Sequence, residues 1–339
     1  MAVEPILITV KTLPMNIKLE TSSPNLTQLP KNYLVSLSHY SAIALSGEEK
    51  SQYLQGQVTC DVESITEHSL LIGAHCSAKG KVYSVFRLLN RNNSHLLIQP
   101  KSSIEASISE LKKFGVFAKV DISETAELGI FAFIGDDATQ ILQKHFSRIP
   151  DSLNPVVNSD STTLVYIKGQ QARYLLIDSK ETIENKVFKM NLPIYKNHIW
   201  DLLEINEGFV QLSSESSNEY VPQMLNLQAM NGISFTKGCY LGQETVARMQ
   251  YLGKNKKALF SLKTLITKPQ KEKAVIEKQF GENWRKAGDV ISAYHADDGT
   301  YYLQAILNSD VDISTNLRLN SQADSKIEIE SLPYSLTVE

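Results

Sequence analysis

The chain has 339 residues, which at roughly 150 residues per domain predicts two domains with a sizeable core. Hydrophobic residues make up 42% of the chain and charged residues 21%, a composition that excludes a mainly disordered protein. The 34 basic and 37 acidic residues give a formal net charge of −3, so the chain lacks the overall positive field of a dedicated nucleic-acid binder. We therefore expect direct binding to RNA to be weak or absent.

The cysteines indicate a reducing compartment. Cys60, Cys76 and Cys239 are odd in number and far apart, so they cannot form a disulfide framework, and no pair has the CxxC spacing of a zinc or iron–sulfur site. The first 15 residues lack the basic start of a signal peptide, and no apolar run approaches the roughly 18 residues that span a bilayer. We expect a cytoplasmic protein with no metal site and no membrane contact.

Strands and helices alternate through the first two thirds of the chain. Four prolines among the first thirty residues predict an arm with little regular structure. Residues 32–45 combine β-branched and aromatic side chains as strands do, and the apolar runs 70–74 and 82–89 flank a glycine turn and predict a hairpin. Further strands are expected at 95–99, 118–122, 128–134, 163–167 and 172–177, and helices at 48–54, 104–114, 136–146 and 181–190.

Short strands dominate after Tyr251. They are separated by turns such as Asp297-Asp298-Gly299 and are expected at 258–265, 274–276, 289–294, 301–307 and 326–331. This pattern predicts a small all-β barrel. We therefore expect an α+β protein with an N-terminal arm over residues 1–30, an α+β core over 31–252 and a C-terminal β-barrel domain over 253–339.

The most unusual stretch of the sequence is FTKGCYLGQE, residues 235–244. Gly238 and Gly242 permit a tight loop that exposes backbone N–H groups before the helical pattern that follows. Lys237 and the start of that helix would favour the thiolate form of Cys239. Cys239 is therefore a candidate functional thiol or a single-cysteine metal contact, and the alternative is a small apolar side chain packed under a glycine turn.

This stretch carries a family resemblance. The motif Lys237-Gly238-Cys239-Tyr240-x-Gly242-Gln243-Glu244, followed by Arg248, resembles the signature of the YgfZ family of folate-binding proteins, which are relatives of the glycine-cleavage T-protein. Other segments resemble family landmarks in their usual order, so the resemblance covers nearly the whole chain: LQGQVT (54–59), AKGK (78–81), NLQ (226–228), GENW (281–284) and LPYSL (332–336).

The resemblance implies the T-protein type of fold, a folate-binding α+β core of two interleaved subdomains around a central channel with a C-terminal β-barrel. The implied cofactor is tetrahydrofolate or a derivative. A folate-contacting tryptophan of the family falls at Trp200, whose alternative role is a core anchor, and a second aromatic position falls at Tyr40. Where T-protein relatives carry a pterin-facing glutamate in Glu-Ala-Gly, this chain reads Asn206-Glu207-Gly208, and Glu204 is a further candidate contact.

The sequence leaves three functions to compare. Family members are linked to assembly or repair of iron–sulfur clusters, so the resemblance implies a tetrahydrofolate-binding accessory protein whose partners are iron–sulfur enzymes such as tRNA methylthiotransferases. The alternative is an aminomethyltransferase like T-protein, but the glycine turn that precedes paired aspartates in those relatives is followed here by Ser84 and Val85, which offer no carboxylate. A third class, a protein that presents tRNA to its modifying enzyme, is disfavoured by the negative net charge.

Overall fold

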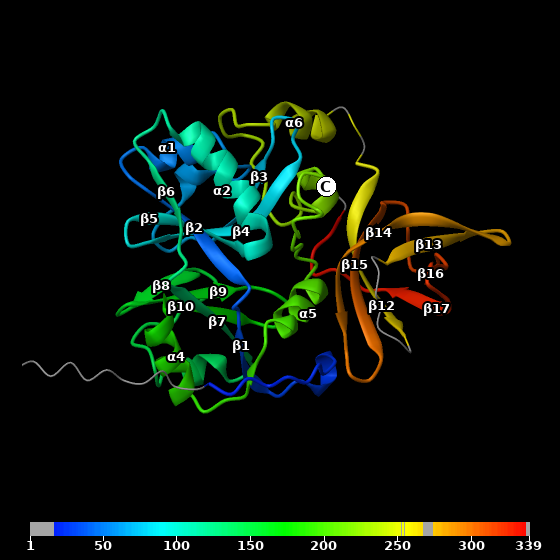
Figure 1. Cartoon of the computed structure of the whole chain (residues 1–339), viewed down its shortest axis with the longest axis horizontal. Helices are drawn as coiled ribbons and strands as arrows, with labels where there is room; N and C mark the ends of the chain where they lie inside the picture. The colour runs from blue at the N-terminus through cyan, green and yellow to red at the C-terminus, as the bar shows by residue number, and fades with distance from the viewer. Residues whose placement is uncertain (1–16, 252, 254, 267–273, 337–339) are drawn as a thin grey trace, which may run out of the picture.

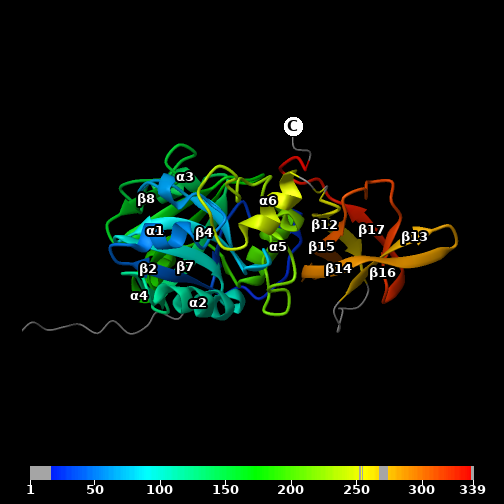
Figure 2. The same cartoon turned by 90° about the horizontal axis from the view of Figure 1, so that it is seen from above.

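The computed structural model describes residues 17–251, 253, 255–266 and 274–336. Residues 1–16 of the expected N-terminal arm, and parts of the expected barrel domain, therefore lie outside the described residues. Two β-sheets covered by helices form one part of the molecule and a closed β-barrel forms the other, with the two sheets stacked beside the barrel (Figure 1). Seen from above, the barrel lies at one end and β13 reaches furthest from the sheets (Figure 2).

The first sheet has the strand order β11-β1-β7-β10-β9-β8. Its central strand β7 is buried on both faces, because Ala132 belongs to the core between the sheets while Phe133 packs under helices α3 and α4. The bounds are β1 (Asn32–Ser36), β7 (Leu128–Gly135), β8 (Val156–Ser159), β9 (Thr162–Ile167), β10 (Arg173–Ser179), β11 (Ile194–Tyr195), α3 (Ala138–Leu142) and α4 (Lys180–Lys189).

The second sheet has the strand order β3-β4-β5-β2-β6. Helices α1 and α2 cover its outer face, where Ile104 and Leu111 of α2 pack on Ile43 and Leu97. The bounds are β2 (Tyr40–Ser46), β3 (Leu71–Cys76), β4 (Val82–Arg91), β5 (Ser94–Pro100), β6 (Asp121–Glu124), α1 (Lys50–Gln55), α2 (Lys101–Gly115), α5 (His198–Asn206), α6 (Gln243–Tyr251), and the short 3₁₀ helices η1 (Leu26–Gln28), η2 (Val62–Ser64) and η3 (Pro222–Leu225).

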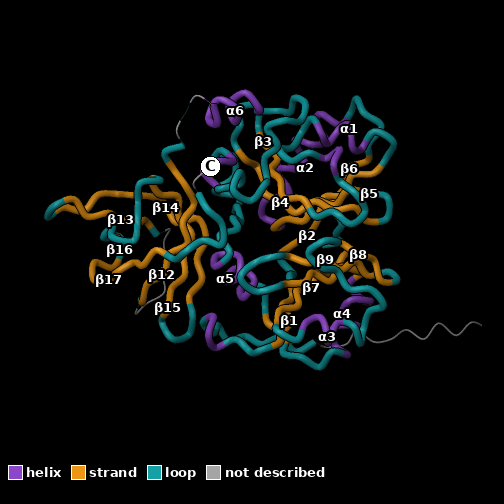
Figure 3. Tube along the Cα trace, turned by 180° about the vertical axis from the view of Figure 1, so that it is seen from behind, coloured by secondary structure: helices purple, strands orange, loops and turns teal. Residues whose placement is uncertain are grey.

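The barrel has the closed order β12-β15-β14-β13-β16-β17, and within its described residues it consists of strands and loops (Figure 3). Strand β15 is buried almost throughout, because Leu303 and Ala305 fill the barrel while Tyr302 and Ile306 face the α+β part. The bounds are β12 (Lys257–Leu265), β13 (Val275–Phe280), β14 (Asn283–His295), β15 (Thr300–Asn308), β16 (Leu317–Leu319) and β17 (Gln322–Ile329).

The barrel supports the end of helix α5. Gln304 Nε2 of β15 donates hydrogen bonds to the carbonyl oxygens of Glu204 (3.3 Å) and Phe209 (3.2 Å), and Ser261 Oγ of β12 donates to Ile205 O (2.6 Å). The Glu204 and Ile205 carbonyls also accept the backbone N–H groups of Phe209 (3.0 Å) and Gly208 (3.1 Å), so the barrel side chains supply a further donor to each. The barrel therefore holds the end of α5 in place, and Glu207 and Phe209, which follow that helix, belong to the candidate site.

Several elements differ from the sequence-based expectation. The expected strand region 32–45 is two strands in different sheets, because a turn closed by the Tyr40 N–H and Leu37 O (2.9 Å) takes the chain from β1 to β2. Helix α3 is shorter than 136–146, because the N–H groups of Lys144 and His145 bond only three residues back and tighten the chain into a turn. Strands β8, β11 and β16 were not expected, since two to four residues are too few to show a periodicity.

Residues 20–25 of the expected arm contact both the barrel and the first sheet. Ser23 N–H donates to Asp297 Oδ2 (2.7 Å), Asn25 Nδ2 donates to Asp298 Oδ2 (2.6 Å), and Glu20 forms an isolated bridge with Tyr195. None of the helices among the described residues is long and apolar enough to cross a membrane. The described ranges also contain no group of three or more His, Cys, Asp or Glu side chains that could hold a metal ion.

Candidate functional site

A cavity of about 710 Å³ lies where the two sheets, the end of α5 and the C-terminal segment meet. This volume falls within the range of small-molecule binding sites. Its wall combines apolar surface with a few charged side chains, and it draws on segments that are more than 250 residues apart in sequence. The residues that carry the argument are Arg87 (β4), Tyr166 (β9), Arg173 (β10), Glu207 and Phe209 (after α5), and Tyr334 (C-terminal segment).

Two buried arginines share one carboxylate beside this cavity. Arg87 contacts both oxygens of Glu204 at 2.9 and 3.0 Å, and Arg173 Nη1 contacts Glu204 Oε1 at 2.6 Å. The three side chains are almost fully buried and carry a formal charge of +1 together. Arg173 Nε has no hydrogen-bond partner among the described residues. A buried excess of positive charge with an unused donor favours an anionic or hydrogen-bond-accepting ligand.

Glu207 supplies a carboxylate on the cavity wall. The backbone N–H of Gln170 donates to its two oxygens at 2.9 and 3.2 Å. A Cβ atom on the neighbouring Gly169 would lie 2.5 Å from Glu207 Oε1, so the glycine makes room for this carboxylate. Glu207 therefore presents a fixed acceptor toward a ligand. Asn206, its neighbour, is partly exposed and does not line the cavity.

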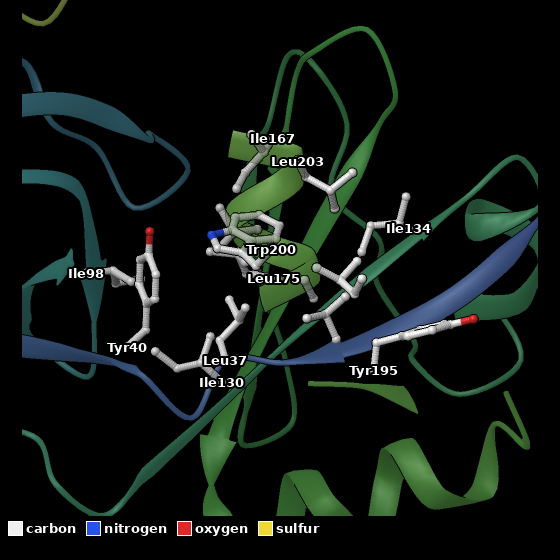
Figure 4. Close-up of a cluster of buried hydrophobic side chains, with 14 of the residues drawn as sticks. Leu37, Tyr40, Ile98, Ile130, Ile134, Ile167, Leu175, Tyr195, Trp200 and Leu203 are labelled. Atoms are coloured by element: carbon white, nitrogen blue, oxygen red, sulfur yellow. The ribbon is translucent and has the colours of Figure 1, made fainter. Parts of the chain in front are cut away.

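The two aromatic residues expected at the folate site lie in the core instead of on the cavity wall. Trp200 is fully buried and Tyr40 is 4% exposed, and both belong to the hydrophobic cluster between the sheets. Figure 4 shows the indole nitrogen of Trp200 directed toward Tyr40, with Leu37 and Ile98 nearby. The guanidinium of Arg173 lies 4.9 Å from the Trp200 ring centroid and that of Arg87 5.8 Å from it.

Trp200 thus lies behind the arginines, and its contact with the cavity is indirect. The aromatic side chains that line the cavity are Tyr166, Phe209 and Tyr334. The Arg87 guanidinium lies 3.7 Å from the centroid of Phe209, which holds that ring in place.

The signature loop brings three sequence landmarks together. Gly242 has φ +85°, and a Cβ atom there would lie 2.4 Å from Ser77 O and 2.9 Å from Gly80 Cα, so the loop packs directly on the 78–81 turn. Leu241 N–H donates to Gly56 O (3.0 Å), which joins the loop to the 54–59 segment. Gln243 Oε1 accepts a hydrogen bond from Tyr240 N–H (3.3 Å) as helix α6 begins, while Glu244 and Arg248 are exposed on that helix.

Lys237 binds the 54–59 segment and Cys60. Its ammonium donates to the carbonyl oxygens of Gln55, Val58 and Cys60 at 2.7 to 2.8 Å, which uses all three of its donors. Burial lowers the pKa of Lys237 to about 8. The expectation that Lys237 acts on Cys239 therefore does not follow from the geometry, because its donors are directed at this other segment.

Cys239 is exposed, whereas Cys60 and Cys76 are buried. Burial raises the pKa of Cys60 to about 12, so this thiol stays protonated. A Cβ atom on the adjacent Gly238 would meet no atom within 4 Å, so the surroundings of the loop are open. The exposed thiol does not line the cavity. Ser84 and Val85 are buried in β4 and do not line it either.

Sequence reasoning missed Arg87 and Arg173, which line the cavity, and also the aromatic side chains of its wall. Arg87 stands inside an otherwise apolar run, VFRLL, and Arg173 begins another, RYLLI. A charged residue in such a run is rarely buried without a partner, so each arginine indicated a buried ion pair. No comparable signal marks Phe209, whereas Tyr334 lies in the LPYSL landmark, to which no role at the site had been assigned.

The comparisons with known proteins agree with this architecture. A family model described as the YgfZ β-barrel domain matches residues 255–322. The chain is 60% identical over 325 residues to the tRNA-modifying protein YgfZ of Colwellia psychrerythraea, covering 96% of this chain and 100% of the relative. The chain belongs to the YgfZ family. Another YgfZ relative, the tRNA-modifying protein of Yersinia enterocolitica, is 38% identical over 306 residues, which cover 90% of this chain and 93% of the relative.

The fold extends beyond the YgfZ family. The crystal structure of the glycine cleavage system aminomethyltransferase T from Bartonella henselae matches with a TM-score of 0.68 at 13% identity, covering 89% of this chain and 86% of that chain. The expected fold class, an α+β protein of the T-protein type with a C-terminal β-barrel, is therefore confirmed.

Proposed function

We propose that this member of the YgfZ family binds tetrahydrofolate or a derivative in the cavity lined by Arg87, Arg173 and Glu207. The observation that carries the proposal is the combination of a cavity of about 710 Å³ with two buried arginines and one fixed carboxylate on its wall. A T-protein-like fold in the YgfZ family supports it.

The residues on the cavity wall fit three features of a folate: the pterin edge, the aromatic rings and an oxygen atom. The Glu207 carboxylate would accept hydrogen bonds from the pterin edge, Phe209 and Tyr166 would pack on the aromatic rings, and the unpaired Nε of Arg173 would bind an oxygen atom. When bound, tetrahydrofolate supplies a reduced pterin that can carry a one-carbon unit. In this proposal Trp200 and Glu204 act by positioning the two arginines, while Tyr40 and Asn206 have no direct contact.

The proposed cellular role is support of iron–sulfur enzymes that methylthiolate tRNA. The relatives are named tRNA-modifying proteins, and the resemblance of the signature motif to that family links this role to iron–sulfur cluster assembly or repair. The exposed Cys239 is the proposed functional thiol, because it is accessible to a partner protein. The motif residues Lys237 and Gly242 hold the loop that presents it.

We expect no aminomethyl transfer. T-protein chemistry needs a carboxylate beside the folate at a position that Ser84 and Val85 occupy here, and both side chains are buried away from the cavity wall. The assay is formation of methylenetetrahydrofolate from an aminomethylated carrier protein. A turnover comparable to that of T-protein would contradict this expectation.

Calorimetric titration with tetrahydrofolate tests the binding proposal. Glu207→Gln should weaken binding roughly 10- to 150-fold, because a charged hydrogen bond of about 1.5 to 3 kcal/mol is lost. Glu105→Gln on the exposed face of α2 is the matched control and should bind as the unaltered chain does. Equal affinities of all three proteins would remove Glu207 from the site, and mass spectrometry of ligand released from freshly purified protein identifies the folate form.

Complementation of a deletion strain tests the cellular role. A Cys239→Ser variant should fold normally and fail to restore tRNA methylthiolation, while the same substitution at Cys60 should act through stability. Thiol-labelling rates provide a second measurement, since exposed Cys239 should react faster than buried Cys60 and Cys76. Full complementation by Cys239→Ser would show that the thiol has no functional role.

A further inference from the structure

The C-terminal segment returns from the barrel to the α+β part of the molecule. Strand β17 ends at Ile329, and Glu330 N–H still bonds to Ser261 O (2.9 Å) of the barrel. Residues 331–336 then cross toward the end of α5, as the red segment in Figure 1 shows. Leu336 packs against the barrel core, while Pro333 and Tyr334 line the cavity. The segment lies beyond the residues that the barrel family model matches.

Tyr334 is held by two hydrogen bonds to separate parts of the fold. Its hydroxyl donates to Gly208 O (2.7 Å), directly after the cavity carboxylate Glu207. The hydroxyl also accepts from Asn226 Nδ2 (3.2 Å). The other side-chain hydrogen bonds of Asn226 are with the backbone of Leu259 in β12, at 2.8 and 3.2 Å. The contact therefore connects the segment to the helix end, to the barrel and to the loop that carries Asn226.

Two backbone features make room for this contact. Gly208 has φ +63°, and a Cβ atom there would lie 2.6 Å from both Leu332 Cδ2 and Tyr334 Oη. Asn226 also has a left-handed conformation, with φ 60° and ψ 20°, which asparagine tolerates better than most residues. Thus the sequence landmarks NLQ and LPYSL meet through Asn226 and Tyr334, although 106 residues separate Asn226 from Leu332.

We infer that Tyr334 is a ligand-retaining residue of the cavity, and that Gly208 and Asn226 position it. This inference rests on the proposed folate binding, since it assigns part of the cavity wall to the end of the chain. Residues 331, 333 and 335 are exposed, whereas Tyr334 is half-buried and its hydroxyl bonds to both Gly208 and Asn226. Loss of these contacts should remove one wall of the cavity without altering Arg87, Arg173 or Glu207.

Stopped-flow binding of tetrahydrofolate tests the inference on the full chain. Tyr334→Phe removes the hydroxyl and keeps the ring, so the dissociation rate should rise about 3- to 10-fold. A chain that ends at Glu330 should dissociate at least about 10-fold faster, with the association rate changed by less than about 2-fold. Tyr301→Phe is the matched control, because Tyr301 is a buried tyrosine in the barrel that does not line this cavity.

The possible outcomes separate this inference from the proposed function. Absence of tetrahydrofolate binding by the unaltered chain would overturn the proposed function and the retaining role with it. Normal binding with unchanged dissociation in both variants would overturn only the role of Tyr334. Association and dissociation rates that rise in proportion would also overturn it, because the segment would then obstruct entry and exit alike. Thermal melts of each variant establish that it is folded, and Tyr334→Phe provides the test even if the shortened chain is unstable.

Discussion

At the scale of single residues, the fold uses buried polar groups as fixed anchors. Lys237 is the clearest case, because one ammonium satisfies three backbone carbonyls in the segment from Gln55 to Cys60. Burial disfavours its charge, and the lowered pKa of about 8 reflects that cost. The three hydrogen bonds offset it and attach the signature loop to the core.

Replacement of Lys237 by Met should therefore lower the free energy of unfolding by about 2 to 4 kcal/mol, because it leaves three carbonyl oxygens without their donor. Urea denaturation measures this loss. Lys79→Met, at an exposed lysine in the neighbouring turn, is the matched control and should cost less than about 0.5 kcal/mol. Equal losses in the two variants would show that the three hydrogen bonds add nothing to stability.

Two histidines should make the protein sensitive to acid. Burial lowers the pKa of His75 and of His95 from 6.5 to about 4, with the charge of Lys50 contributing at His95. Below pH 6.5 these histidines bind protons in the unfolded chain but not in the folded chain. The free energy of unfolding that they contribute above that pH is therefore lost as the pH falls toward 4.

Each histidine should contribute a slope of at most about 1.4 kcal/mol per pH unit within this window. Denaturant unfolding at a series of pH values measures the slope, and His75→Gln should make it shallower by removing one of the two groups. The same slope in the variant and in the unaltered chain would contradict the assignment to His75.

At the scale of elements, close backbone approach joins the signature loop to the β3–β4 turn. Gly242 and Gly80 both have positive φ, and side chains at these positions would collide with the opposite segment. Gly238 stands four residues earlier in the same loop, yet a Cβ atom there would meet nothing within 4 Å. The two loop glycines therefore have different roles although the sequence motif presents them alike.

Alanine at these two positions provides a matched comparison. Gly242→Ala should destabilise the protein by at least about 2 kcal/mol, because it combines an unfavourable φ with a backbone clash. Gly238→Ala should cost less than about 1 kcal/mol. Thermal and urea unfolding measure both, and similar costs at the two positions would mean that the loop can move away from the turn.

At the scale of the whole molecule, the barrel and the α+β part share their cores. Tyr294 and Tyr302 of the barrel belong to the cluster that contains Trp200, and Leu259 and Ile306 pack with Phe209. The end of helix α5 also depends on Gln304 and Ser261 of the barrel for hydrogen bonds. Separation of the two parts would expose these apolar side chains and leave polar groups unpaired.

We therefore expect both parts to unfold in one transition. The fluorescence of Trp200 in a Trp284→Phe variant reports on the α+β part, and circular dichroism reports on the whole chain, so the two midpoints should coincide. Tyr302→Ala should lower both midpoints together, at a cost of about 3 kcal/mol. Leu265→Ala, at an exposed barrel residue, is the control, and two separate transitions would show that the parts unfold independently.

The sequence by itself determined the element types, the change to a barrel after Tyr251 and the family. Alternation and helical spacing are local properties, so β3, β4, α2, β12 and β15 were placed within a few residues of their observed bounds, whereas β14 begins six residues before the expected strand and β16 was not expected. The signature loop could also be recognised from the sequence, since its glycines and its cysteine form a motif of residues close together in the chain. The sequence predicted Glu207 as a candidate contact but did not predict that it, instead of Asn206, faces the cavity.

Only the tertiary structure decided how these parts meet. The barrel and the two sheets pack on α5, and their packing decides which face of that helix is directed toward the cavity. This packing places Trp200 behind Arg87 and Arg173. The direction of the Lys237 ammonium and the position of Tyr334 likewise result from contacts between residues that are more than 100 positions apart. Local propensity contains no information about such contacts, because they arise when the whole chain buries its apolar surface together.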